Sequence, residues 1–218
     1  ESDAGLNGRA LSYPRGKVLG GCSSINGMIY MRGQARDYDQ WRQLGNEGWG
    51  WEDIMPWFLK SEDNYRGKSD MHGAGGEWRV EQQRLSWEVL DAFRDAADEV
   101  GIPKTDDFNL GTNEGSGYFE VNQRKGVRVN TAKAFLRPAM KRPNLRVITH
   151  AHTSKLMLDG KRVTGVEFDI KGKLSRARAR LEVILTAGSI GSPQIMELSG
   201  IGRPDVLKGH DIDVAHDL

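Results

Sequence analysis

Residues 16–33, GKVLGGCSSINGMIYMRG, decide the fold, because a glycine pair, Gly20 and Gly21, stands directly before small and apolar residues. Glycine adopts backbone conformations that other residues avoid, and its missing Cβ lets the main chain lie close to a ligand or another segment. Either Ser23 or Ser24 can cap the first turn of a short helix after the pair. We therefore expect a sharp turn into a helix start, whose free N–H groups suit an anionic group.

The second informative stretch is residues 182–198, EVILTAGSIGSPQIMEL. Its apolar first half predicts a buried strand over 182–188, and a helix is expected near 192–198. A short apolar strand that ends in glycine before a helix is how α/β folds bring main chain to a nucleotide. Both stretches thus favour a nucleotide-binding protein with helices and strands.

Hydrophobic periodicity predicts the remaining elements. The clearest is a helix over 87–100, with Ser86 as its N-cap and Gly101 as its stop. From residue 144 onward the pattern changes to β. The other expected elements are two helices within 37–63, a strand over 116–123, a short helix introduced by Asn130 and Thr131, a strand over 145–149, a hairpin over 156–170 that turns at Asp159-Gly160, and a strand over 176–181.

Composition excludes several classes of protein. With 31 Lys plus Arg against 30 Asp plus Glu, the net charge of +1 gives no bulk attraction to nucleic acid or anionic membrane. The alternating arginines of 176–181 are interpreted as a solvated strand face, and the balance of charge speaks against nucleic-acid binding through the basic run 171–180. One cysteine, Cys22, excludes an internal disulfide framework. No apolar run approaches the roughly 20 residues of a transmembrane helix.

The sequence has no initiating Met and no basic-then-apolar leader, and it reads as an internal piece of a longer chain. We expect a cytoplasmic protein, with peripheral association at the inner face of the membrane left open.

Motifs for complete catalytic or metal sites are missing from the sequence. The dinucleotide fingerprint G-x-G-x-x-G is incomplete in two places. The run that starts at Gly115 has Glu120 at the position of the last glycine, and the run that starts at Gly200 has Asp205 there. The hydrolase motif G-x-S-x-G is broken at Ile25. His150 and His152 could share one face of a strand, but they lack a carboxylate partner for a metal. We therefore assign no catalytic residue and no metal ligand.

The two informative stretches resemble the two signatures of the glucose–methanol–choline (GMC) oxidoreductases. The first signature is similar to 16–27, continued by 30–33 and 37–41, and the second to 187–202. They occur in the order and at about the spacing of that family. Weaker similarity lies in the glycine-rich loop 72–76, in 128–132 and in 143–145.

The resemblance implies FAD as the cofactor. Some members tether FAD through a histidine at the position of Ile25, so non-covalent FAD is expected here. The family contacts adenine at the position of Thr153 and places the segment of Ala187 and Gly188 close to the same nucleotide. The residues that the resemblance assigns to the flavin and its phosphates are Val18, Gly20, Gly21, Ser24, Asn26, Gly27, Met28 and Ile29.

The fold class implied is mixed α/β, a partial FAD-binding domain of GMC type with part of an antiparallel-sheet substrate domain. We expect residues 1–70 and 144–218 to serve FAD binding, and residues 71–143 to belong to the substrate domain. The tryptophan-rich stretch 41–57 would cover the flavin and exclude water.

The activity implied is oxidation of an alcohol, choline-like or another primary alcohol, to the aldehyde by hydride transfer to flavin N5. The partners are a small-molecule alcohol and an electron acceptor that the sequence does not identify. The family's dinucleotide fingerprint and catalytic histidine are not in these 218 residues, so this stretch alone is expected to bind FAD poorly and to be inactive. The alternative is a non-catalytic homologue that acts as a binding module.

Overall fold

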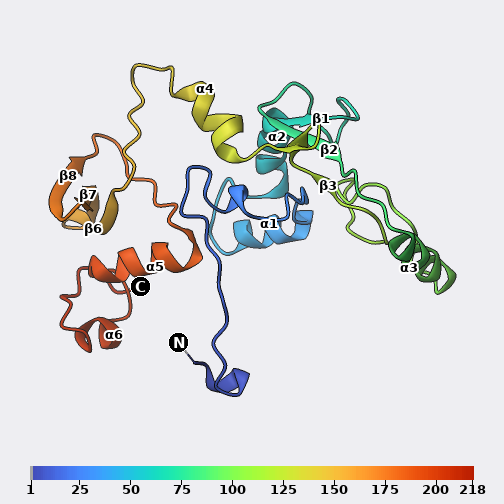
Figure 1. Ribbon diagram of the computed structural model, residues 1–218. Coiled ribbons are helices and arrows are strands. Elements are labelled where there is room, and N and C mark those ends of the chain that lie inside the picture. The colour runs from blue at the N-terminus through green and yellow to red at the C-terminus, as the bar shows by residue number, and fades with distance from the viewer. Residues whose placement is uncertain (1) are drawn as a thin grey trace. The chain divides into compact units, whose positions relative to one another are not determined.

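The computed structural model describes residues 2–218 and divides the chain into two compact units. One unit ends at Leu145, and the other comprises Arg146–Leu218 (Figure 1). The division into 1–70, 71–143 and 144–218 stays a prediction.

Two helices in the first unit confirm the prediction for 37–63. Helix α1 spans Ala35–Gln43, and helix α2 spans Trp51–Ser61 with Pro56 inside it. Each has an aspartate in its first turn, Asp37 or Asp53, whose side chain accepts a hydrogen bond from the main-chain N–H three residues earlier. The Gly50 N–H, for example, donates to Asp53 Oδ2 at 3.1 Å. This contact satisfies main-chain donors that a helix start leaves free.

A small mixed sheet follows α2. Strand β1 (Glu62–Asn64) pairs in parallel with β2 (Trp78–Gln82), and β2 pairs antiparallel with β3 (Glu120–Val121). Val80 in β2 is completely buried. The strand predicted over 116–123 is thus shorter than expected. A separate two-stranded ribbon joins β4 (Gln123–Arg124) to β5 (Val127–Arg128).

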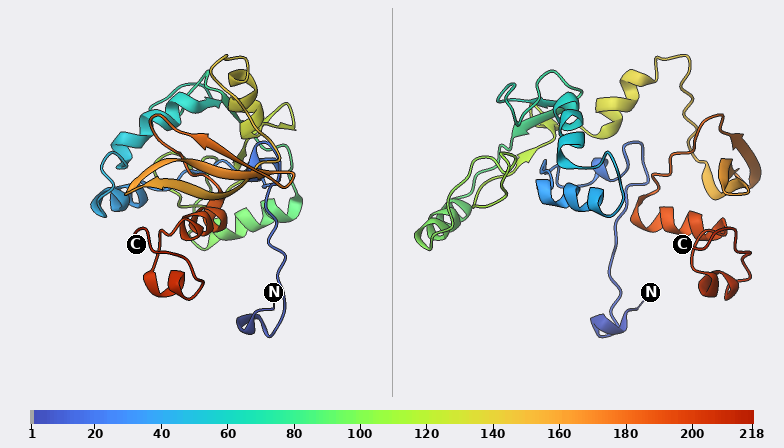
Figure 2. Two further views of the ribbon diagram at one scale, coloured as in Figure 1. Left: turned by 90° about the vertical axis from the view of Figure 1, so that its left-hand side faces the viewer. Right: turned by 180° about the vertical axis from the view of Figure 1, so that it is seen from behind.

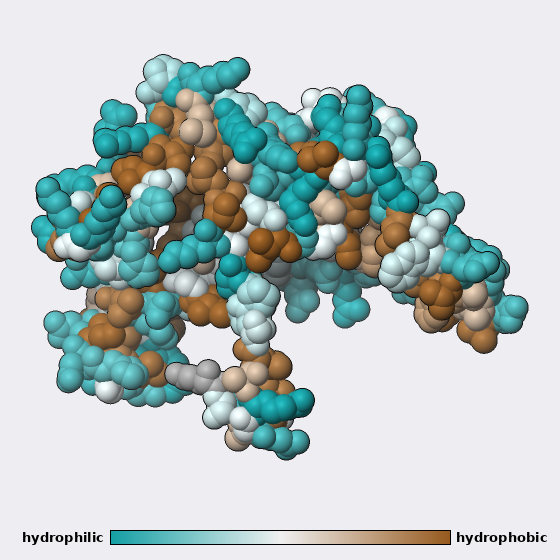
Figure 3. Space-filling model, in the orientation of Figure 1, coloured by the Kyte–Doolittle hydropathy of each residue, from teal (hydrophilic) through white to brown (hydrophobic). Residues whose placement is uncertain are grey.

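Helix α3 (Glu88–Glu99) confirms the predicted 87–100 helix, but Ser86 is not its cap. The first helical bonds run from Leu90 and Asp91 to the carbonyl of Trp87, so Trp87 is the N-cap. The expected apolar stripe is mostly solvent-exposed, with Phe93 69% exposed, and apolar atoms gather at this helix in Figure 3.

The remaining helical segments of the first unit are short. The helix expected after Thr131 is present as a π-helical turn that continues into α4. Ser23 and Ser24 lie inside a single 3₁₀ turn instead of capping a helix, because Gly20 occupies its N-cap with φ +93°. These segments are η1 (Ala4–Leu6), η2 (Gly21–Ser24), η3 (Ala132–Leu136) and α4 (Arg137–Ala139).

The second unit is a three-stranded antiparallel sheet with two helices. The order is β6 (His152–Asp159), β7 (Arg162–Ile170) and β8 (Lys173–Arg178), which confirms the hairpin (Figure 2). Its turn is Gly160-Lys161, one residue later than predicted, because Asp159 still pairs with Arg162. Helix α5 (Gly188–Leu198) packs against β6, where Ser199 Oγ accepts from the Leu156 N–H at 2.8 Å. Helix α6 spans Pro204–Lys208.

Two predicted strands are wrong. Residues 145–149 alternate in polarity but pair with no strand among residues 2–218, and residues 182–187 are likewise unpaired, with Ile184 76% exposed. A buried strand needs hydrogen-bonded neighbours, and no main-chain hydrogen bond among the described residues pairs either stretch with another segment.

The mixture of helices and sheets confirms the predicted fold class. Within the described residues the longest α-helix has 12 residues, and none is long and apolar enough to cross a membrane.

Candidate functional site

The loop around Gly20 and Gly21 is a tight turn of the kind that favours glycine. Gly20 has φ +93° and Gly21 has φ +53°, both in the left-handed region. A Cβ on Gly16 would lie 2.2 Å from the Gly21 carbonyl oxygen, so two parts of the loop touch main chain to main chain. The loop is therefore folded on itself.

A distant segment fixes this loop. Thr131 N–H donates to Ser23 Oγ at 3.0 Å, and Asn130 Nδ2 donates to Ser24 Oγ at 2.8 Å. Gly20 lies against the same segment, because a Cβ there would come within 3.1 Å of Asn130 Nδ2. These bonds join residues more than 100 positions apart, so the loop keeps its shape through tertiary contacts.

The turn that follows the loop has an unusual backbone. Met28 has φ +63°, which is rare for a residue with a large side chain. Its N–H donates to Asn26 Oδ1 at 3.1 Å, and its carbonyl accepts from the Asn122 N–H at 2.8 Å. Such positions persist only where surrounding contacts hold them, and they cluster at functional sites.

The loop leaves an apolar face uncovered. Val18 is 57% exposed, and Ile25 and Ile29 are each 50% exposed, although the main chain between them is held by hydrogen bonds. A rigid loop that presents aliphatic side chains and close-approach glycines fits a flat, partly apolar ring system. The residues present therefore fit a flavin.

The structure brings the predicted residues of the first signature together on this one loop. They are Val18, Gly20, Gly21, Ser24, Asn26, Gly27, Met28 and Ile29. Contact of each with a cofactor stays a prediction.

The other three predicted residues lie in the second unit. Thr153 is in β6, opposite Phe168. Ala187 is the N-cap of α5, and Gly188 starts that helix with φ +92°. Their grouping with the loop around one nucleotide stays a prediction.

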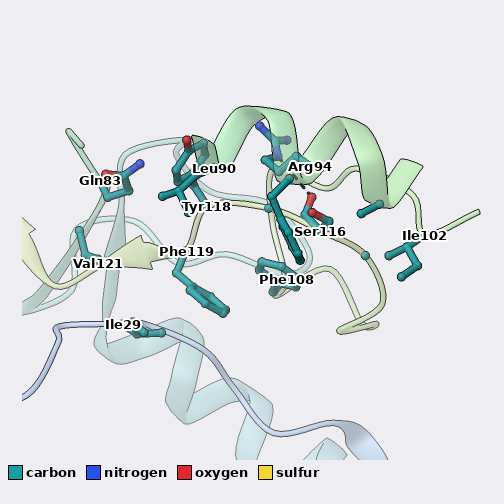
Figure 4. A pocket seen from close by; sticks show the side chains of 14 residues that line it. Ile29, Gln83, Leu90, Arg94, Ile102, Phe108, Ser116, Tyr118, Phe119 and Val121 are labelled. Carbon is teal, nitrogen blue, oxygen red and sulfur yellow. Dashed lines mark hydrogen bonds between the residues drawn. The ribbon is translucent and has the colours of Figure 1, made fainter. Parts of the chain in front are cut away.

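An apolar cavity of about 600 Å³ borders the loop at Ile29. Leu90 and Arg94 of α3 face Phe108 and Phe119 across it (Figure 4). The two phenylalanine rings lie 5.0 Å apart between centroids. This volume falls in the range of small-molecule sites.

A buried histidine links two carboxylates in the first unit. His72 Nδ1 lies 3.1 Å from Glu62 Oε1, and His72 Nε2 lies 2.7 Å from Asp107 Oδ2. The bond to Asp107, followed by that to Glu62, raises the pKa of His72 to about 9, so the ring is charged at neutral pH. Burial opposes ionisation of Glu62, but bonds from His72 and the Gly73 N–H outweigh it and lower the pKa of that carboxyl.

Two arginines, the buried Arg32 and the exposed Arg66, complete this charge cluster. Arg32 Nη2 donates to Glu62 Oε2 at 2.6 Å, and Arg66 Nε donates to Glu120 Oε1 at 2.9 Å. Asn109 Oδ1 also accepts from the Arg32 N–H at 2.9 Å, which holds the irregular segment after the loop in place. Cations and anions balance: Arg32, Arg66 and His72 against Glu62, Asp107 and Glu120.

Three members of the charge cluster also have the chemistry of metal ligands. One ligand atom each of His72, Asp107 and Glu120 lies within 4.8 Å of the others. However, both ring nitrogens of His72 are already hydrogen-bonded to carboxylates, and Arg66 already supplies positive charge to Glu120. We interpret the cluster as a structural hydrogen-bond network.

Sequence reasoning did not identify the charge cluster. Its members come from separated segments with no motif spacing. The one signal was the glycine-rich loop after His72, where a Cβ on Gly73 would lie 1.9 Å from the Leu59 carbonyl oxygen.

Comparison with protein families gives one match over nearly the whole chain. The model described as GMC oxidoreductase matches residues 3–212.

Curated relatives align over the full chain. An oxygen-dependent choline dehydrogenase of Photobacterium profundum is 44% identical over 224 aligned positions, and one of Brucella anthropi is 42% identical over 217. Each alignment covers 100% of this chain and 39% of the relative, so the chain spans about two fifths of the length of these relatives.

Solved structures give a similar result. A pyridoxine 4-oxidase from Mesorbium loti has a TM-score of 0.88 and 31% identity, over 100% of this chain and 43% of the oxidase. An FAD-dependent oxidoreductase from Chaetomium thermophilum has a TM-score of 0.90 and 30% identity, over 99% of this chain and 40% of the other.

Proposed function

The chain belongs to the GMC oxidoreductase family, and on this premise we propose that the whole protein oxidises an alcohol with FAD. The observation that carries the proposal is the loop at residues 16–29, which is rigid, glycine-bent and apolar on its open face.

The residues of the loop would hold FAD from one side. When bound, FAD accepts a hydride at N5 as the alcohol becomes an aldehyde. The bent main chain at Gly20 and Gly21 permits close approach, and Val18 and Ile29 supply apolar contact that excludes water. The segment 128–131 keeps the loop in place before the cofactor arrives.

Choline is the first substrate to test, with other primary alcohols next. Support comes from relatives at 42–44% identity that are named oxygen-dependent choline dehydrogenases. Oxygen and an artificial dye are the two electron acceptors to compare.

The base that takes the hydroxyl proton is not His72, the one histidine before Leu145 in the sequence. Both of its ring nitrogens are bonded to carboxylates, so it is neither exposed nor free to accept a proton. We also propose that these 218 residues alone do not turn over an alcohol, since no motif of a complete catalytic site occurs among them.

The experiment is anaerobic titration of the purified intact polypeptide with choline and with a panel of primary alcohols. We expect a flavin absorption spectrum that bleaches on substrate addition, and no bleaching with the 218-residue chain. An intact protein that carries flavin but is reduced by no alcohol would contradict the proposed reaction and favour a non-catalytic binding module.

We also propose that FAD is bound non-covalently, since Ile25 has no nucleophile for a covalent link. Acid precipitation is expected to release all the flavin into the supernatant.

A cytoplasmic location is the final part of the proposal and is supported by the single thiol, Cys22, which is not in a disulfide. Cell fractionation with an antibody tests this location and detects a peripheral membrane pool.

A further inference from the structure

Two donors hold the side chain of Asn26. Its Oδ1 accepts from Arg128 Nη1 at 2.8 Å and from the Met28 N–H at 3.1 Å. The same Arg128 nitrogen donates to the Ser23 carbonyl at 3.1 Å. Arg128 therefore reaches from β5 to both ends of the segment 23–26.

These contacts fix which end of the amide points where. A guanidinium and a main-chain N–H can only donate, so the atom that faces both must be the amide oxygen. The Asn26 NH₂ group then points away from Arg128. Asn26 is exposed, and no protein atom among residues 2–218 accepts a hydrogen bond from its Nδ2.

The backbone next to Asn26 supports a ligand-binding role for its amide group. Met28 is held at φ +63° by the same amide oxygen, and the Asn122 N–H holds its carbonyl. Backbone strain of this kind persists only where the surrounding structure holds it, and it is concentrated at ligand-binding positions. The exposed NH₂ group lies on the loop between the uncovered side chains of Ile25 and Ile29.

We propose that Arg128 is a positioning residue, which orients Asn26 so that the amide NH₂ donates a hydrogen bond to an acceptor atom of the bound cofactor. The acceptor class is a flavin carbonyl or ring nitrogen, or a phosphate oxygen. This inference rests on the proposed function, because it requires that FAD binds to this loop.

The test uses Asn26→Asp in the intact flavoprotein. An aspartate still accepts from Arg128 and from the Met28 N–H, so the turn and the melting temperature are expected to be retained. It cannot donate, so the dissociation constant for FAD, measured by flavin fluorescence after reconstitution of the apoprotein, is expected to rise about tenfold. The rise is expected to persist at 1 M salt, where charge repulsion is screened beyond about 3 Å.

Arg128 is tested through Asn26. Arg128→Ala is expected to weaken FAD binding about fivefold and to change the visible circular dichroism of the remaining bound flavin. Arg128→Lys keeps a single donor nitrogen, and it is expected to restore most of the FAD affinity and most of the circular dichroism of the bound flavin. The matched control is Arg124→Ala, since Arg124 is an exposed arginine of the neighbouring strand that pairs with Asp63 at 3.2 Å. Arg124→Ala should leave the FAD affinity and the circular dichroism of the bound flavin unchanged.

Several results would overturn the inference. One is wild-type FAD affinity in Asn26→Asp, and another is a loss of affinity that disappears in high salt. If Asn26→Asp does not fold, the Arg128 pair decides, and an unchanged flavin spectrum in Arg128→Ala rejects the positioning role. A wild-type protein that binds no FAD would instead refute the proposed function.

Discussion

At the scale of single residues, His72 is expected to make the free energy of unfolding decrease at alkaline pH. Its folded pKa of about 9 lies above the unfolded value of about 6.5, so protonation favours the folded state. The stabilisation is complete below about pH 6 and is lost as the pH rises through 9, for a total of about 3 kcal/mol. Urea unfolding of the chain between pH 6 and pH 10, followed by circular dichroism, measures this loss.

The control for this prediction is His72→Gln, which has no titrating ring. Its stability should be lower than that of the wild type at pH 7 and nearly flat up to pH 9.5. An equally steep alkaline loss in the variant would assign the effect to another group and contradict the role of His72.

This residue-scale network could not be predicted from the sequence. Arg32, Glu62 and Asp107 stand tens of positions apart, and each alone looks like an ordinary surface charge. Their burial follows from the paths of three separate segments, which periodicity does not report. The first signature, by contrast, is continuous in sequence, so its residues can be predicted together as one candidate site, and their contact with a cofactor stays a prediction.

At the scale of elements, the contact between the glycine-rich loop and helix α2 is expected to tolerate no side chain. A Cβ on Gly73 would lie 1.9 Å from the carbonyl oxygen of Leu59, which is main chain and cannot rotate away. Gly73→Ala is therefore expected to destabilise the protein by about 3 kcal/mol, toward the upper end of overpacking costs. Thermal unfolding measures the change.

The matched control is Gly27→Ala, where no atom lies within 4 Å of the new Cβ and φ is not positive. We expect its melting temperature to stay within about 1 °C of the wild type, since surface changes of this kind are close to neutral. Equal destabilisation by both substitutions would show that glycine content, not the contact with α2, sets the cost.

Helices were predicted better than strands because their signals are local. The apolar spacing within 87–100 and the breaker Gly101 are sufficient to place α3. A strand needs a partner, and the alternation at 145–149 or the apolar run at 182–187 says nothing of whether one is present. The β6–β7 hairpin was predicted correctly because the second strand follows the first after a two-residue turn.

At the scale of the whole molecule, the boundary between the two units is expected to be among the parts most open to proteolysis. From Arg146 to Ala151 no main-chain hydrogen bond is present in the described structure, and most of these residues are exposed. A protease needs several residues of extended, unbonded chain, which this segment provides and the sheet β6–β7–β8 does not. Brief subtilisin treatment with mass spectrometry is therefore expected to give an early cut within 146–151. The exposed stretch 10–15 should be cut at a similar rate, and a first cut inside the β6–β7 hairpin would contradict the division at Leu145.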